Sequence, residues 1–166
     1  MKHFLTGILF CVLALGSFAQ DEYVDSLRNE LSVAKEDTIK VAIYKELFNY
    51  YIHYGNNGIG DCYADTILLY SKKSKSDDLI AKAYFYKGIV KYIMGDYASS
   101  AKYYGNAEQV AKKIEDKNLL GLIYSGLGEI YREYNNYEQA HHYFNDALEK
   151  MQSTGNNEAC AAVLVN

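Results

Sequence analysis

The chain has 166 residues, with 17 Lys and Arg against 21 Asp and Glu, which gives a formal net charge of −4. Charges of both signs are interspersed along the chain, so the sequence predicts no basic patch and disfavours nucleic acid as a partner. The chain contains 18 tyrosines and no proline. The absence of proline is typical of an array of helices, because proline breaks helix interiors.

The first residues predict a secretory signal peptide over residues 1–19. Lys2 and His3 precede an apolar run from Phe4 to Leu15, and small residues follow at Ser17 and Ala19. The apolar run is shorter than the ~20 residues that a membrane-spanning helix needs, which makes an uncleaved anchor the less favoured alternative. We therefore expect an exported, periplasmic protein that begins at Gln20 and has no membrane span after cleavage.

Two cysteines, Cys62 and Cys160, remain after cleavage. About five helices separate them in the predicted repeat order, which is too far for bridged Cα atoms within about 7 Å. We expect both thiols to be unpaired and packed as small hydrophobic side chains.

Residues 20–36 predict a short amphipathic helix that caps the N-terminal end of the fold. Val24, Leu27, Leu31 and Ala34 fall on one helical stripe, with charged residues elsewhere. A terminal unit of a repeat array must cover the apolar surface of its neighbour.

A 40-residue interval organises the rest of the chain. Tyr44, Tyr84 and Tyr124 are each 40 residues apart, and so are Gly88 and Gly128. The interval divides the chain into units of about 37–76, 77–116 and 117–157, and residues 158–166 start a truncated fourth unit. The interval covers the longest stretch of the chain in four tyrosines, Tyr23, Tyr63, Tyr103 and Tyr143, which are each 40 residues apart.

Each unit predicts two helices. The predicted helices run from Asp37 to about 54, about 61–75, about 79–94, about 97–114, about 119–134 and about 137–151. We expect Asp37 to act as an N-cap and the glycine-rich stretch from Asn56 to Asp61 to form a link. The six residues beyond the ~34 of a common helical repeat are expected in the second helix and its exit loop.

The third unit carries a motif that resembles the tetratricopeptide repeat. The motif reads Tyr124-x2-Leu127-Gly128-x2-Tyr131 in the first helix and Ala140-x3-Phe144-x2-Ala147 in the second. Tyr124 stands where the family pattern has Trp, and the closing Pro of the pattern is absent. The resemblance implies an all-α, right-handed α-solenoid of helix–turn–helix repeats that binds proteins.

The sequence lacks the common catalytic and metal-binding motifs. HExxH, the P-loop, CxxC and G-x-S-x-G are all absent. His53 is alone on its predicted helix, and the adjacent His141 and His142 point in different directions. We therefore expect no enzymatic activity, no cofactor and no metal site.

The resemblance also implies a binding face, because tetratricopeptide proteins bind partners chiefly through outward positions of each first helix. It predicts a scaffold or adaptor that holds a peptide or protein segment on its concave face. The residues at those positions are Lys45, Asn49, Ile52, His53, Lys82, Phe85, Ile89, Tyr92, Ile93, Leu122, Ser125, Glu129, Arg132 and Glu133. Five tyrosines outside the main repeating set are further candidates for lining a groove: Tyr50, Tyr54, Tyr86, Tyr92 and Tyr134.

A second resemblance gives an alternative function. The stretch from Asp21 to Lys45 and the length of the repeats are similar to the N-terminal sensor regions of some Gram-negative signalling proteins. In those proteins a membrane span and a histidine kinase or DNA-binding output domain follow the repeats. On this alternative the chain is the periplasmic sensor part of a receptor, and sequence beyond Asn166 would distinguish the two.

Overall fold

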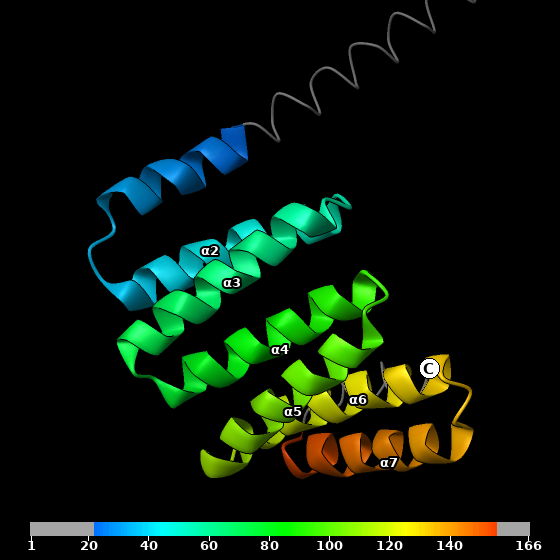
Figure 1. Cartoon of the computed structure of the whole chain (residues 1–166). Helices are drawn as coiled ribbons and strands as arrows, with labels where there is room; N and C mark the ends of the chain where they lie inside the picture. Colours follow the sequence, from blue (N-terminus) through cyan, green and yellow to red (C-terminus); the bar gives the residue numbers. More distant parts are fainter. Residues whose placement is uncertain (1–21, 156–166) are drawn as a thin grey trace, which may run out of the picture.

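The computed structural model describes residues 22–155 and contains only helices in that range (Figure 1). A first helix covers residues 22–33. It is followed by α2 (Asp37–His53), α3 (Asn57–Ser74), α4 (Asp77–Ile93), α5 (Tyr97–Lys113), α6 (Lys117–Glu133) and α7 (Tyr137–Ser153). The prediction of an all-α solenoid of helical repeats is confirmed. The predicted signal peptide, the predicted start of a fourth repeat and Cys160 lie outside the described residues.

The helices pair in chain order and the pairs stack along one direction (Figure 1). Repeat 1 consists of α2 and α3, repeat 2 of α4 and α5, and repeat 3 of α6 and α7. The helices of repeats 2 and 3 have 17 residues each, and turns over residues 94–96, 114–116 and 134–136 join them. The prediction that the second helix takes the extra residues is therefore wrong, because the two helices have equal lengths in repeats 2 and 3 and differ by one residue in repeat 1.

Short polar side chains start four of the helices. Ser76, Asp96, Asp116 and Asn136 each accept a hydrogen bond from the backbone N–H three residues later. The start of α2 is different from the prediction. Glu36, not Asp37, occupies the N-cap position, and its side chain makes no capping hydrogen bond.

The predicted glycine-rich link is also wrong, because α3 begins at Asn57 and includes most of that stretch. A left-handed residue, Gly55 with φ of 74°, already makes the turn. Gly60 has another purpose: a Cβ atom there would lie 2.6 Å from Cδ1 of Ile52. This glycine allows α2 and α3 to approach closely.

At one position of each repeat an aromatic ring packs against a small residue of the paired helix. In repeats 2 and 3 the ring belongs to the second helix: a Cβ on Gly88 would collide with the ring of Tyr104, and a Cβ on Gly128 would lie 2.6 Å from Phe144. In repeat 1 the large and the small residue are exchanged between the two helices. Phe48 stands at the glycine position and Ala64 at the ring position, and both are buried in one cluster.

The buried side chains run from one end of the stack to the other. Val24 and Leu27 of the first helix pack with Ile43 and Leu47 of α2, as expected of a capping helix. Further clusters join α2 to α4 and α4 to α7. Cys62 is unpaired but exposed, so the prediction that this thiol is packed inside is wrong.

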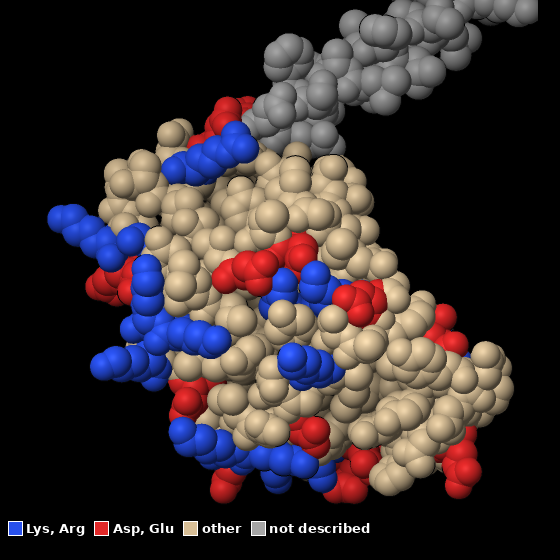
Figure 2. All heavy atoms as spheres, viewed as in Figure 1, with Lys and Arg blue, Asp and Glu red and all other residues tan. Residues whose placement is uncertain are grey.

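One junction between repeats contains a group of charges. Nζ of Lys87 lies 2.6 Å from Oδ1 of Asp61 and 2.8 Å from Oδ1 of Asp65, and Nζ of Lys91 lies 2.7 Å from Oδ2 of Asp61. Figure 2 shows acidic and basic side chains side by side over α3 and α4. The side chain of Lys87 is only 2% exposed, so α4 joins α3 through a buried ammonium group.

Candidate partner-binding face

Two adjoining hollows lie between the first helices of the repeats. The first, of about 400 Å³, lies mainly between α2 and α4, and the second, of about 310 Å³, between α4 and α6. We call them the α2–α4 hollow and the α4–α6 hollow. The α2–α4 hollow is lined by Thr38, Val41, Ala42, Lys45, Ile67, Leu79, Lys82 and Tyr86. The α4–α6 hollow is lined by Lys82, Phe85, Tyr86, Asp116, Asn118, Leu119 and Leu122.

Lys82 and Tyr86 belong to both hollows and form the wall between them. The ring of Tyr86 is held by Phe48, at 5.3 Å between ring centroids, and by Phe85, at 6.1 Å. Burial raises the pKa of Tyr86, so its phenol stays neutral and can donate a hydrogen bond. The two hollows therefore lie side by side with an aromatic divider, and we call them together the recess.

Two lysines give the recess its charge. Nζ of Lys45 lies 3.0 Å from Oε1 of Glu46, and Nζ of Lys82 lies 2.7 Å from Oδ1 of Asp78. Both lysine side chains are about two-fifths exposed, at 41% and 43%. Exposed pairs of this kind contribute little to stability, so either ammonium can exchange its partner for an acidic group of a ligand.

A hydrogen-bonded network joins the C-terminal halves of α4 and α6. The hydroxyl of Tyr92 lies 3.5 Å from Oε2 of Glu129 and 3.3 Å from Oε1 of Glu133, and it donates to these carboxylates. Tyr97 donates to Oε2 of Glu133 at 3.2 Å, and Arg132 pairs with Glu129. Burial, followed by the charges of both glutamates, raises the pKa of Tyr92. This end of the first helices is acidic, in contrast to the lysine-lined recess.

One atom of this network is buried without a partner. Oε1 of Glu129 makes no hydrogen bond to the described residues. A buried carboxylate oxygen normally accepts a hydrogen bond, and leaving it unsatisfied costs free energy. Oε1 of Glu129 is therefore an unsatisfied acceptor inside the network.

The sequence-predicted face divides into groups in the structure. The residues that line the hollows are Lys45, Lys82, Phe85 and Leu122. The residues in the network between α4 and α6 are Tyr92, Glu129, Arg132 and Glu133. Two others, Ile52 and Ile89, pack against the core. The exposed members are Asn49, His53 and Ile93, and Ser125 is half-buried.

Sequence reasoning missed one group of lining residues and recognised another. It missed residues at the N-terminal ends of the first helices: Thr38, Val41, Ala42, Asp116 and Asn118. These residues lie near the starts of α2 and α6, where the sequence analysis named no binding-face residue. Three of the five tyrosines proposed for a groove do line pockets: Tyr50, Tyr54 and Tyr86.

Metal sites and membrane-spanning helices are two further features that residues 22–155 could contain. No group of three or more His, Cys, Asp or Glu side chains in this range is arranged to hold a metal ion. No helix in the described part is both long enough and apolar enough to cross a membrane.

Comparison with known proteins supports the fold and the class. Residues 79–153 match the family model of the tetratricopeptide repeat. The chain is also similar to the solved structure of BtubC (BKLC) from P. vanneervenii, with a TM-score of 0.68 and 17% sequence identity over 87% of this chain and 60% of that chain. At this identity the similarity shows the fold alone, and this chain spans less than two-thirds of the BtubC chain. A search of curated proteins found no match.

The fold, the repeat geometry and the family match all indicate the same kind of helical repeat. Residues 79–153 match tetratricopeptide repeats, as the motif predicted, and the described part of the chain has the fold of a helical-repeat solenoid. This family supports a role as a protein–protein interaction module.

Proposed function

We propose that the chain is an exported, non-catalytic scaffold or adaptor that holds an extended peptide or protein segment along its first helices. The observation that carries this proposal is the recess, in which the α2–α4 and α4–α6 hollows lie side by side along the first helices. Four of the predicted binding-face residues line it. Stacked repeats use such concave surfaces to bind extended partners.

The chemistry of the recess selects a kind of segment. Apolar walls from Val41, Leu79 and Leu122 accept apolar side chains. Lys45 and Lys82 favour acidic groups beside them. The proposed partner is therefore an extended segment in which acidic and apolar residues alternate.

Selection from a random peptide library displayed on phage tests this proposal. With the full chain as bait, we expect enrichment of segments that combine acidic and apolar residues. The variant Lys45→Glu with Lys82→Glu reverses the charge of the recess, and the enriched peptides should bind it at least about tenfold more weakly, which corresponds to 1.4 kcal/mol. Fluorescence anisotropy of a labelled, enriched peptide measures the change.

The matched control is Lys102→Glu, which changes an exposed lysine of the second helix α5. It should leave peptide affinity unchanged, and far-ultraviolet circular dichroism should show the same helicity for all variants. Equal binding by the control and by the double variant would mean that the recess is not the binding face.

Export is tested separately from binding. The N-terminal residue of the protein recovered from the periplasm is expected to be Gln20, since the proposed cleavage follows Ala19. An intact N-terminal Met on a cytoplasmic protein would contradict export without affecting the peptide-binding proposal.

The sensor function remains the alternative proposal. It rests on the similarity of Asp21 to Lys45 to signalling proteins. A membrane span and an output domain encoded downstream of Asn166 would support it, and the same recess would then bind the signal.

A further inference from the structure

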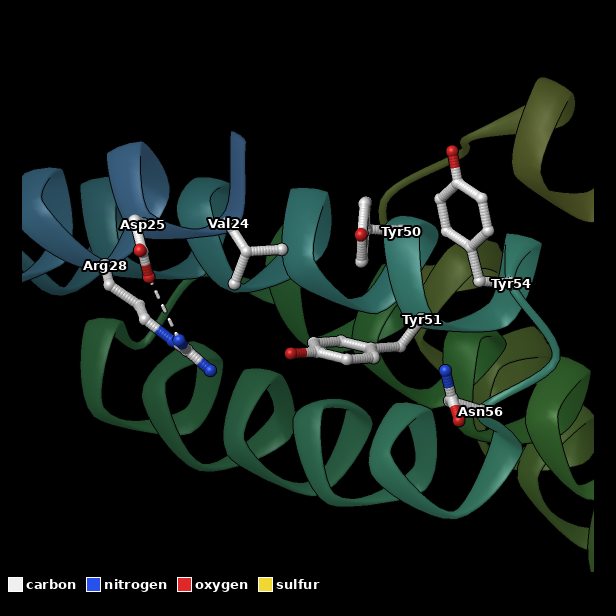
Figure 3. A pocket seen from close by; sticks show the side chains of 7 residues that line it. All are labelled: Val24, Asp25, Arg28, Tyr50, Tyr51, Tyr54 and Asn56. Atoms are coloured by element: carbon white, nitrogen blue, oxygen red, sulfur yellow. Dashed lines mark hydrogen bonds and ion pairs between the residues drawn. The ribbon is translucent and has the colours of Figure 1, made fainter. Parts of the chain in front are cut away.

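A second pocket lies away from the recess, between the first helix and the C-terminal half of α2 (Figure 3). Its volume is about 430 Å³, which is within the range of small-molecule sites. The first helix contributes Val24, Asp25 and Arg28, and α2 with the following turn contributes Tyr50, Tyr51, Tyr54 and Asn56. We call it the tyrosine pocket.

The repeat register shows which residues stand at the same positions in later repeats. The counterparts of Tyr50 are the smaller Val90 and Ile130, which are 0% and 1% exposed. The counterpart of Tyr54 in repeat 3 is Tyr134, whose ring packs edge-on against Tyr97, the first residue of α5, at 5.9 Å. In repeat 1 two large rings, Tyr50 and Tyr54, line the tyrosine pocket.

The aromatic walls hold one another in place. Tyr51 stacks on Tyr63 at 5.5 Å with an interplanar angle of 17°, so one of its faces is supported by the protein. Tyr50 meets Tyr51 edge-on at 5.3 Å and Tyr54 at 4.7 Å. Rings fixed by several neighbours offer a contact surface that loses little conformational entropy when a ligand binds.

Polar groups lie at both ends of these walls. Figure 3 shows Asp25 and Arg28 at one end, Asn56 beside Tyr54 at the other, and Tyr50 and Tyr51 between them. Nη1 of Arg28 donates to Oδ1 of Asp25 at 3.1 Å, and the two side chains are 57% and 66% exposed. The pair has no net charge, and the unused N–H groups of Arg28 and the second carboxylate oxygen of Asp25 provide donors and acceptors side by side.

We infer that the tyrosine pocket binds a neutral sugar ring. A pyranose has an apolar C–H face that can pack on a tyrosine ring, and its hydroxyl groups are donors and acceptors at once. Such hydroxyls match a guanidinium beside a carboxylate at one end and an amide at the other. The neutral ion pair disfavours a charged ligand, because an anion would meet Asp25 and a cation would meet Arg28.

Saturation-transfer difference NMR with the full chain tests this inference. The probes are glucose, galactose, mannose, N-acetylglucosamine and their β-linked disaccharides, with glucuronate as the charged comparison. We expect saturable binding of at least one neutral sugar, with the strongest transfer to ring C–H protons. Tyr54→Ala should weaken binding about tenfold, and so should Asp25→Asn combined with Arg28→Gln.

Two controls separate this site from the rest of the surface. Tyr134→Ala removes an exposed tyrosine at the equivalent position of repeat 3 and should leave sugar binding unchanged. The recess variant Lys45→Glu with Lys82→Glu should also bind sugar normally, so failure of the peptide-binding proposal would not affect this one. All variants involve exposed or half-exposed side chains, and circular dichroism verifies their folding.

Three results would overturn the inference. The first is the absence of saturable binding for every neutral sugar in the panel. The second is binding that survives both tyrosine-pocket variants or is lost equally in Tyr134→Ala. The third is tighter binding of glucuronate than of the neutral sugars, which would assign the pocket to an anion.

Discussion

The two junctions between repeats use the same geometry with opposite chemistry. Where α4 meets α3, Lys87 is 2% exposed and binds Asp61 and Asp65. Where α6 meets α5, the residue 40 positions later is Leu127, which is 6% exposed and packs in an apolar cluster. The counterparts of the two aspartates there are Ala101 and Gly105. The same position of the repeat is therefore a lysine at one junction and a leucine at the other, and both side chains are buried.

This difference shows that the helical repeat fixes the backbone but leaves the chemistry of each junction free. A buried ion pair is weak evidence for added stability, because desolvation offsets much of the attraction. It is costly to break, however, because the remaining charge stays buried. We interpret the Lys87 network as a feature that fixes the order of the repeats. If α4 packed on any helix other than α3, Lys87 would be without its carboxylate partners.

The largest effect is expected from removing both carboxylates, with Asp61→Asn and Asp65→Asn together. Lys87 would then be buried without a counter-charge, and the free energy of unfolding should fall by about 3 kcal/mol. Urea denaturation at pH 7, followed by circular dichroism, measures the loss.

Adding Lys87→Leu to that pair provides the control. The third change copies the leucine of the other junction and removes the stranded ammonium, so most of the lost stability should return. A triple variant no more stable than the double variant would show that packing, rather than charge, controls this junction.

The next effect concerns the apolar junction, where α6 lies close to Tyr104. A Cβ on Gly126 would lie 2.7 Å from Cε2 and 2.9 Å from Oη of Tyr104. Gly126→Ala should therefore lower the free energy of unfolding by about 1–3 kcal/mol, the usual cost of overpacking. Gly105→Ala is the matched control, because no atom lies within 4 Å of its Cβ position. There the helix should gain up to about 1 kcal/mol. A similar loss for both variants would contradict the close approach.

The two junctions also show which features of the fold could be predicted from the sequence and which could not. The 40-residue interval predicted the helices, because tyrosines, glycines and alanines recur at the positions where helices touch. It did not predict the role of Lys87, whose partner Asp61 is 26 residues away and has no charged counterpart in later repeats. Gly60 was misinterpreted for a similar reason. A glycine required for helix contact and a glycine required for a turn look alike in a sequence.

The candidate sites follow the same pattern. The resemblance to tetratricopeptide proteins, carried across by the register, predicted a binding face on each first helix, and four of its residues line the hollows. The register did not give the hollows themselves, because their walls combine residues of neighbouring repeats. The tyrosine pocket was not predicted as a site for the same reason, since its lining combines the first helix with the C-terminal half of α2.

A smaller effect should appear with pH at the charged junction. Burial by itself raises the pKa of Asp61, but hydrogen bonds from Lys87 and Lys91 and their charges outweigh it, so the pKa lies below its ordinary value of 3.8. A lowered pKa in the folded state adds stability above the unfolded pKa, and this stability is lost as the pH falls through the folded pKa. Denaturation at pH 6 and at pH 3 should show a larger loss for the natural chain than for the triple variant. Equal losses would mean that Asp61 is not stabilised by the lysines.

The smallest effect is expected from the exposed ion pair within repeat 2. Nζ of Lys113 lies 2.7 Å from Oδ2 of Asp77, a distance as short as those around Lys87, but the two side chains are 69% and 41% exposed. Water and salt screen such a pair, so Lys113→Ala should change the free energy of unfolding by less than about 0.5 kcal/mol. Urea denaturation in low and high salt measures this. Stability losses comparable to those of the Asp61 and Asp65 variant would show that distance matters more than burial. The expected contrast instead makes burial the property that distinguishes the junction of α3 and α4 from an ordinary surface ion pair.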